Sequence, residues 1–210
     1  MAVETLAPVC SALGLNPTDA QLRALSSYLD LLQRWNATYN LTAVRDRYAM
    51  LTQHLADCLA AVPPLLARCA AGRVLDVGSG GGLPGVVLAV LAPALDVTCV
   101  DTVGKKAAFI RQVAGQLGLP NLHAAHSRVE QLKGPPFQLI TSRAFASLAD
   151  FTALTAPLLA PGGVWMAMKG KRPDDEQAAL PAAVEVFHVE PLQVPGLEAE
   201  RCLVWMRPAA

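Results

Sequence analysis

Apolar and polar positions change their spacing at about residue 73, and the second part of the chain alternates short apolar runs with amphipathic segments. The apolar runs predict strands at 74–77, 96–101, 121–126, 137–142 and 164–169, with two later strands near 183–190 and 201–206. The segments between them predict helices at 84–91, 104–117, near 128–132 and at 147–159, the last of which enters a turn at 161–163. This alternation predicts an α/β fold with a mostly parallel, seven-stranded, Rossmann-like sheet and helices on both faces.

The first 70 residues have a helical pattern instead. Thr18 is a candidate N-cap, and Leu22, Leu25, Leu29 and Leu32 follow it at helical spacing. Residues 36–40 break the pattern, and a second helix is expected over 47–62, ending at the two prolines 63–64. We therefore expect an N-terminal helical extension over 1–70 that packs on a catalytic domain over 71–210, which forms one compact unit.

Composition excludes several classes of protein. Hydrophobic residues make up 53% of the chain and charged residues 16%, which suits a packed globular core. The longest apolar stretch, 86–100, is interrupted by Pro93 and Asp96, and the first residues lack the basic segment of a signal peptide. We expect a cytoplasmic protein without membrane contact.

The five cysteines form no CxxC pair and no cluster with histidine at zinc spacing, so we expect them to be small buried residues and expect no metal site. The formal net charge is zero, which is not typical of a general nucleic-acid binder. Binding to nucleic acid would then depend on local groups of basic residues.

The richest motif lies between the first expected strand and the next helix. Residues 80–85 fit the G-x-G-x-x-G of dinucleotide-binding folds, whereas Asp76, Gly78, Gly80 and Gly82 fit the D-x-G-x-G-x-G of S-adenosylmethionine-dependent methyltransferases. S-adenosylmethionine carries an ammonium and a sulfonium group, so a carboxylate at this position attracts it but would repel a diphosphate. The motif therefore favours S-adenosylmethionine, with the acid and the three glycines as cofactor-binding residues.

A second acid, Asp101, ends the next expected strand. An acid at this distance from the glycines typically binds the ribose hydroxyls of a nucleotide, and it suits nicotinamide cofactors and S-adenosylmethionine equally. It could also be the N-cap of the helix that follows.

The residues with candidate chemistry share one location in the expected sheet. Asp76, Asp101, the segment after His126, Arg143 and Lys169 all follow or end expected strands. The carboxyl ends of parallel strands meet at one edge, where ligands of such sheets bind. We therefore expect these residues to surround a single site.

The sequence lacks motifs that some classes of methyltransferase need, and this reduces the number of candidate acceptor atoms. The fourth expected strand leads into 141–145, which differs from the Pro-Pro loop of amino-methylating enzymes, and no cysteine is expected at the active edge for attack on a pyrimidine. Lys169 alone is weak evidence for ribose methylation. Guanine N7 fits better, because its lone pair is exposed and carries no proton, so that the enzyme needs no general base.

Several further motifs resemble one known family. These are Trp35-Asn36, residues 40–46 (NLTAVRD), 54–59 (HLADCL), 75–85 (LDVGSGGGLPG), 127–130 (SRVE), 142–146 (SRAFA) and 168–170 (MKG). Together they resemble the bacterial 16S rRNA (guanine-N7) methyltransferase G family, also called glucose-inhibited division protein B. The resemblance implies a class I S-adenosylmethionine-dependent methyltransferase that methylates guanosine 527 of 16S rRNA and releases S-adenosylhomocysteine.

The resemblance also implies roles for residues by position. Gly78 and Leu83 would line the methionine side of the cofactor, Val129 and Glu130 its adenine, and Arg143 both the cofactor and the acceptor pocket. Arg143 and Lys169 are the candidate catalytic residues. The RNA-facing candidates are Asn40, Thr42, Arg45, His54, Asp57 and Lys169. Two positions depart from the family pattern: Gln53 replaces an arginine, which puts one RNA contact in doubt, and Gly81 replaces an alanine.

Alternatives remain at this stage. The chain could be a nicotinamide-dependent oxidoreductase, or a ribosome-associated binding protein without catalysis. Glu130 and Lys169 could be ordinary surface residues, Arg143 a structural ion-pair partner, and His54 a core residue. Trp35 and Tyr39 are expected to be core residues. The partner implied is 16S rRNA, within the small ribosomal subunit or one of its assembly intermediates.

Overall fold

The computed structural model describes residues 2–143, 145 and 147–209, with side chains from Leu6 onward. Ala144 and Ala146, which belong to the motif at 142–146, lie outside the described residues. The strands are β1 (Gly72–Val77), β2 (Leu95–Asp101), β3 (Leu122–His126), β4 (Phe137–Ser142), β5 (Leu159–Lys169), β6 (Val184–Pro191) and β7 (Cys202–Pro208).

The helices precede the sheet and fill the connections between its strands. The α-helices are α1 (Ala2–Ala12), α2 (Asp19–Tyr39), α3 (Arg47–Met50), α4 (Asp57–Arg68), α5 (Gly85–Leu91), α6 (Gly104–Leu117), α7 (Leu148–Thr155) and α8 (Asp174–Ala178). A π-helical segment, η1 (Leu51–Ala56), joins α3 to α4, and η2 (Val129–Gln131) and η3 (Ala156–Leu158) are 3₁₀ turns.

The seven strands form one sheet in the order β3-β2-β1-β4-β5-β7-β6. The pairs from β3 to β5 are parallel, and β7 runs antiparallel to both β5 and β6. This confirms the prediction of a mostly parallel seven-stranded sheet. Because β7 is antiparallel, its first residue pairs with the last residue of β5, as Cys202 does with Lys169.

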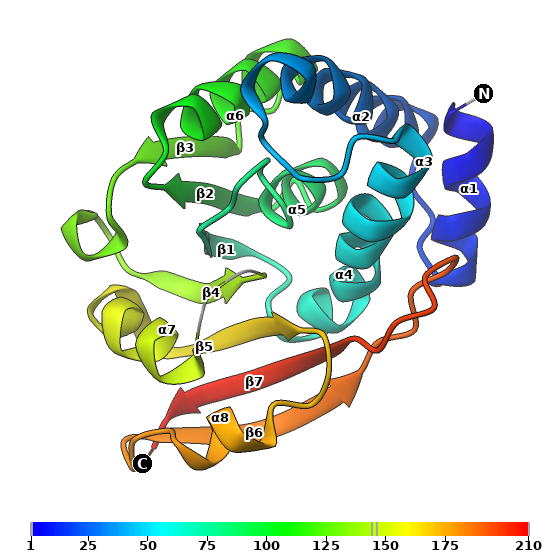
Figure 1. Ribbon diagram of the computed structural model, residues 1–210. Coiled ribbons are helices and arrows are strands. Elements are labelled where there is room, and N and C mark those ends of the chain that lie inside the picture. Colours follow the sequence, from blue (N-terminus) through cyan, green and yellow to red (C-terminus); the bar gives the residue numbers. More distant parts are fainter. Residues whose placement is uncertain (1, 144, 146, 210) are drawn as a thin grey trace.

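Alternate residues of the central strands enter two different cores. On β1, Val74 packs into a core shared with α2, α4, α5 and α6, whereas Leu75 and Val77 pack into a second core with α7. Figure 1 shows α5 and the N-terminal helices on one side of the sheet and α7 on the other. Both faces are therefore covered, as expected for a parallel sheet. The division at residue 70 stays a prediction.

Most expected elements are confirmed, and α6 has the predicted bounds. Thr18 caps α2 through a capping box with Gln21, but the expected break at residue 36 is wrong. Asn36 is buried inside the helix, where its side chain donates to the carbonyl of Val44 and accepts from the N–H of Thr42. The asparagine holds the connection after the helix, and the helix ends only at Asn40, whose φ is +50°.

The expected end at the two prolines is also wrong, because α4 continues through Pro63 and Pro64 to Arg68. Proline removes a backbone donor and disfavours a helix interior. Here Leu59, Val62 and Leu65 are all fully buried on the same helix, and this packing outweighs the two lost donors. The turn expected at 161–163 instead lies within β5, which begins at Leu159.

The remaining expectations concern absences. All five cysteines are free and buried, as predicted. Among the described residues, no group of histidine, cysteine and acidic side chains is arranged to hold a metal ion. No described helix has the length and apolar character needed to cross a bilayer.

Candidate active site

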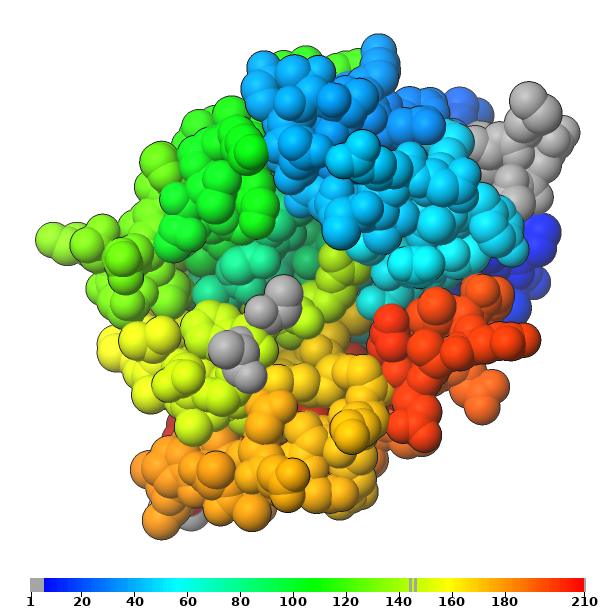
Figure 2. All heavy atoms as spheres, viewed as in Figure 1, coloured from blue at the N-terminus to red at the C-terminus, as the bar shows by residue number. Residues whose placement is uncertain are grey.

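The residues that sequence analysis expected at one edge do meet there. Asp101 ends β2, His126 ends β3, Ser142 ends β4 and Lys169 ends β5, while Asp76 is the penultimate residue of β1. In the view of Figure 2 the segment that includes the glycine loop, 78–85, lies recessed between the blue N-terminal helices and the green α6. The candidate site is therefore at the carboxyl edge of the sheet, where its topology predicts a ligand.

The glycine loop presents bare backbone to open space. Gly78 and Gly80 have φ values of +66° and +58°, and a Cβ added to either would meet no atom within 4 Å. The N–H of Gly78 donates to the carbonyl of Val100 at 2.9 Å, which ties the loop to β2. Glycine alone takes these φ values without strain, and the missing side chains leave room for a ligand against the backbone.

Asp76 lies beneath the loop rather than in a cavity. It is fully buried, and its Oδ2 accepts a hydrogen bond from the N–H of Gly85 at 2.8 Å, while Oδ1 has no partner among the described residues. Burial raises the pKa of Asp76 to about 7, although the Gly85 N–H and Arg143 act in the opposite direction. Its observed role is to fix the start of α5 beneath the loop, not to present a charge at the surface of the site.

Asp101 connects the glycine loop to α6. Its Oδ2 accepts from the N–H of Gly80 at 3.0 Å, its Oδ1 accepts from the N–H of Val103 at 2.9 Å, and Lys106 Nζ lies 3.7 Å from Oδ2. The N-cap of α6 is Val103, so the alternative of Asp101 as the N-cap is wrong. Its position beside the loop is compatible with the expected ribose contact.

Val129 and Glu130 lie on η2, just after β3. Val129 is buried in the second core, and Glu130 is exposed. The structure therefore places a buried apolar side chain and an exposed carboxylate beyond the end of β3, on the same edge as Asp101.

Sequence analysis missed Tyr28, which contacts the glycine loop from α2. Its hydroxyl donates to the carbonyl of Gly81 at 2.8 Å, and its ring is fully buried. A Cβ on Gly81 would lie 3.1 Å from Leu32 Cδ1, so a second residue of α2 also packs against the loop. The signal was available, because Tyr28 follows Leu25 by three residues and therefore shares the buried face of the helix.

A small cavity of about 140 Å³ lies against the loop, and we call it the glycine-loop cavity. Its volume is below the ~300 Å³ of typical small-molecule sites, so a larger ligand would extend beyond it. Asp76, Gly82 and Asp101 do not line it. The lining residues are Leu32, Leu41, Thr42, His54, Gly78, Ser79, Gly80, Gly81, Leu83, Lys106 and Arg143.

A second cavity of about 360 Å³ adjoins it, and we call it the charged cavity. Three cationic side chains and one carboxylate line it, together with neutral groups. The lining residues are Gln53, His54, Asp57, Arg143, Met168, Lys169, Gly170 and Arg201. Because Arg143 and His54 also line the glycine-loop cavity, these two side chains form a wall that the cavities share.

His54 is neutral within this wall. Burial, and then the neighbouring Arg143, lower the pKa of its imidazole to about 4. Arg143 Nη1 lies 3.5 Å from Nδ1 of the imidazole, and Thr42 Oγ1 lies 2.7 Å from Nε2. His54 thus orients Arg143 and Thr42 and is not an isolated core residue.

Asp57 links the two arginines of the charged cavity. Its Oδ1 accepts from Arg201 Nε at 3.0 Å, and its Oδ2 lies 3.8 Å from Arg143 Nη1. Only 3% of Asp57 is exposed, and burial raises the pKa of its carboxyl group even though both arginines lower it. The carboxylate therefore holds two guanidinium groups in place. Arg143 does have an ion-pair partner, as one of the alternatives expected, and it also lines both cavities.

Lys169 is paired as well. Its Nζ lies 2.7 and 2.9 Å from the two carboxylate oxygens of Glu176 on α8, and 3.5 Å from the carbonyl of Phe145. The amine is thus an ion-paired cation at the wall of the charged cavity. This arrangement does not provide the free amine that a general base requires.

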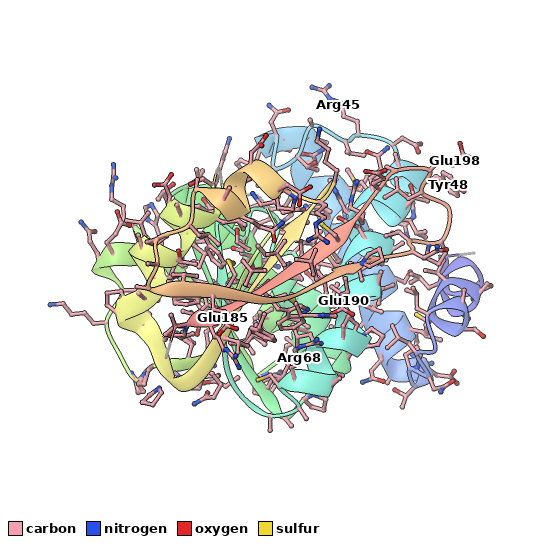
Figure 3. All side chains as sticks on the ribbon, turned by 90° about the horizontal axis from the view of Figure 1, so that it is seen from below. Arg45, Tyr48, Arg68, Glu185, Glu190 and Glu198 are labelled. Atoms are coloured by element: carbon pink, nitrogen blue, oxygen red, sulfur yellow. The ribbon has the colours of Figure 1, made fainter. Side chains whose placement is uncertain are left out.

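The expected RNA-facing residues differ in exposure. Asn40 and Arg45 are exposed on the connection between α2 and α3, and Figure 3 shows Arg45 pointing outward. Thr42 lies deeper and lines the glycine-loop cavity. The core prediction is wrong for Tyr39, which is 42% exposed, whereas Trp35 packs against the core.

Arg201 is the second functional candidate that sequence analysis missed. It directly precedes β7, and the expected site was built only from the carboxyl ends of strands. An antiparallel strand brings its amino end to that same edge, so the missing signal was the direction of β7 rather than a motif.

Comparisons with known proteins agree with this architecture. Residues 21–204 match the model of a family described as rRNA small subunit methyltransferase G. A protein of Acidovorax ebreus named ribosomal RNA small subunit methyltransferase G is 62% identical over 210 aligned positions, covering 95% of this chain and 92% of that one. The protein of the same name from Leptothrix cholodnii is 62% identical and covers 98% of this chain and 95% of its own.

Solved structures with lower identity share the fold. TrmN from Thermus thermophilus superposes with a TM-score of 0.59 at 21% identity, covering 76% of this chain and 53% of that one. The Burkholderia thailandensis 1,6-didemethyltoxoflavin-N1-methyltransferase, solved with S-adenosylhomocysteine, gives 0.57 at 17% identity, covering 88% and 90%. These neighbours place the sheet among those of Rossmann-like methyltransferases.

Proposed function

The chain belongs to the rRNA small subunit methyltransferase G family, and we propose that it transfers a methyl group from S-adenosylmethionine to N7 of a guanosine in 16S rRNA. By resemblance the guanosine is number 527. The observation that carries the proposal is the shared wall: Arg143 and His54 border both the cavity at the glycine loop and the cavity lined by cations.

The residues at the glycine loop fit the proposed cofactor. Gly78 and Gly80 offer backbone with open space in front of it, and Leu83 adds an apolar wall for the methionine side. The glycine-loop cavity holds only part of such a molecule, so Asp101, Val129 and Glu130 would bind the nucleoside part along the neighbouring edge. Asp76 and Gly82 would contribute through the shape of the loop.

Methyl transfer to guanine N7 needs no side chain that acts as a general base. S-adenosylmethionine supplies an electrophilic methyl group on a sulfonium leaving group. Guanine N7 has an available lone pair and no proton to lose, so alignment of the two is the main requirement. The neutral His54 and the ion-paired Lys169 agree with a site that positions its substrates without a general base.

Arg143 would orient the acceptor base from the shared wall, and Lys169, which also lines the charged cavity, would act beside it. Asn40, Thr42 and Arg45 would approach the RNA from the connection between α2 and α3, with His54 and Asp57 holding the wall. Because the formal net charge is zero, we propose that the small subunit, or an assembly intermediate in the cytoplasm, presents the RNA.

The test uses small ribosomal subunits from cells that lack the modification. The protein is incubated with them and with methyl-labelled S-adenosylmethionine, and N7-methylguanosine is mapped in the rRNA. We expect label at one guanosine, at position 527. Naked 16S rRNA in a parallel reaction distinguishes the two forms of substrate.

Three outcomes would contradict all or part of the proposal. Cofactor binding without label would favour a ribosome-associated binding protein, and saturable NADH binding without S-adenosylmethionine binding would favour an oxidoreductase. Label at a ribose or at another base atom would overturn the N7 assignment while keeping a methyltransferase.

A further inference from the structure

We propose that the charged cavity binds a backbone phosphate of the RNA substrate and that Arg201 is its principal donor. The inference rests on the proposed function for the identity of the RNA. Its direct support is a polar cavity of about 360 Å³ into which three chain segments far apart in sequence bring a cation each.

The charge of the cavity suits an anion. Arg143, Lys169 and Arg201 line it, and Asp57 is the one carboxylate among its lining residues. Glu176 pairs with Lys169 but does not line the cavity. The lining side chains thus carry an excess of positive charge, which attracts a phosphate and would repel a cationic ligand.

The guanidinium of Arg201 is held in place with donors to spare. Its Nε donates to Asp57 and its Nη1 donates to the carbonyl of Glu200 at 2.8 Å. A guanidinium has five N–H donors, so these two contacts with described residues leave one Nη1 hydrogen and both Nη2 hydrogens for a ligand. One donor from each of the two Nη atoms matches two phosphate oxygens, which favours phosphate over a neutral group.

The surroundings extend the cavity along a path for the RNA strand. A larger cavity of about 660 Å³ shares Gly170 and Arg201 with the charged cavity, and its lining adds two cations, Lys171 and Arg172, and one carboxylate, Glu200. The charged cavity also borders the glycine-loop cavity, through the wall of Arg143 and His54. A phosphate on Arg201 would therefore place its nucleoside beside this wall while the strand continues toward Lys171.

The experiment measures RNA binding without catalysis. Fluorescently labelled parent and Arg201→Gln proteins are titrated with small ribosomal subunits that lack the modification, by anisotropy, at several salt concentrations between about 50 and about 200 mM. Loss of one phosphate contact should weaken binding about tenfold and reduce the salt slope by about 1. The affinity for S-adenosylmethionine, measured by calorimetry, should not change.

Arg207→Gln is the matched control. Arg201 directly precedes β7, whereas Arg207 lies near the far end of that strand, where it pairs with Glu185 at 2.8 Å. Figure 3 shows Glu185 on the opposite side of the molecule from Arg45. This variant removes the same charge and should bind the RNA like the parent protein.

Removal of Arg201 leaves Asp57 buried without its closer partner, so thermal unfolding of each variant is compared with the parent. Arg201→Lys keeps a charge beside Asp57 but loses the paired donors, and Asp57→Asn with Arg201→Gln removes both charges. Both should lose RNA affinity as Arg201→Gln does.

The inference is overturned if folded Arg201 variants bind RNA like the parent, if they lose cofactor affinity equally, or if the parent itself does not bind the RNA. RNA binding that depends on Arg201 in a protein without methyl transfer would instead contradict only the proposed function.

Discussion

The glycine-loop cavity and the charged cavity share a wall, but different kinds of chemical group line them. Backbone atoms of the loop and apolar side chains such as Leu32 and Leu83 form most of the first. Charged side chains make up half of the lining residues of the second, and Asp57 holds Arg143 and Arg201 in place through ion pairs. The first is shaped by the path of the chain, and the second by the meeting of distant charges.

This difference in lining predicts how ligand binding at each cavity responds to salt and to substitutions. Backbone geometry does not respond to salt, whereas exposed charges are screened by it. We therefore expect loop substitutions to weaken cofactor binding without changing salt dependence, and substitutions of cations to weaken RNA binding with a changed salt dependence.

The largest expected effect comes from Gly85→Ala, which disturbs the packing beneath the glycine loop and leaves the residues of the charged cavity unchanged. The added Cβ would overlap Cys99 Sγ and lie 3.0 Å from Asp76 Oδ2, and both residues are fully buried. Overpacking of this kind reduces the free energy of unfolding by about 1–3 kcal/mol. Urea denaturation should show this loss, and calorimetry should show at least a tenfold weaker affinity for S-adenosylmethionine.

Gly115→Ala is the control for this substitution, because the new Cβ meets no atom within 4 Å and the residue lies in α6. Adding Cys99→Ala to Gly85→Ala should recover part of the lost stability. An unchanged Gly85→Ala protein would show that the loop tolerates a shift and would weaken the contrast between the cavities.

The next effect is the pH dependence of stability from Asp76. Its pKa is about 7 in the folded protein against an ordinary value of 3.8, so the folded state binds a proton that the unfolded state releases between these values. This contribution to stability is fully present below about pH 4 and is lost as the pH rises to about 7. Asp76→Asn should lack it.

The measurement is the difference in urea midpoint between the parent and Asp76→Asn across this range. The parent should lose stability relative to the variant as the pH rises. A difference that does not vary with pH would mean that the carboxyl group is ionised throughout this range. It would then support the expectation from the sequence that Asp76 offers a negative charge to the cofactor.

A smaller effect is expected from Tyr28→Phe, which removes the hydrogen bond between α2 and the carbonyl of Gly81. One such bond contributes about 1 kcal/mol, so the dissociation constant of S-adenosylmethionine should rise about fivefold. RNA affinity should stay the same. Tyr39→Phe, at the exposed end of the same helix, should leave both affinities unchanged, and an effect on RNA from Tyr28→Phe would show that the helix couples the cavities.

The smallest effect is expected from Arg45→Ala, because this arginine is exposed on the connection after α2. RNA binding should weaken about two- to fivefold, with a salt slope lower by about 1, while cofactor binding stays constant. Titrations at two salt concentrations test this. A loss of cofactor affinity would place Arg45 on the loop side of the comparison.

Sequence analysis was most successful where a feature is local. The bounds of α6, the cap at Thr18 and the convergence of strand ends follow from spacing and from the topology of parallel sheets. The glycine loop was found for the same reason. The position of Asp76 at a strand end was also predicted, but its burial was not, because burial depends on the packing of α5 and β2 over it.

Long-range features were the ones missed. Tyr28 reaches a loop more than 50 positions away, and Arg201 reaches Asp57 across 144 positions. The end of α2 was misplaced because Asn36 forms its hydrogen bonds inside the fold rather than at a helix end. In each case the residue type was visible, but its partner was set by tertiary structure.

The position of Arg201 just before β7, the last strand of the chain, has a consequence for the order in which the ribosome makes the two cavities. Every lining residue of the glycine-loop cavity lies between positions 32 and 143, whereas the lining of the charged cavity includes Arg201, which is synthesised much later. A growing chain thus holds all the lining residues of the glycine-loop cavity well before those of the charged cavity. If the charged cavity binds the RNA as we propose, the capacity to act on RNA arises last in the synthesis of the chain.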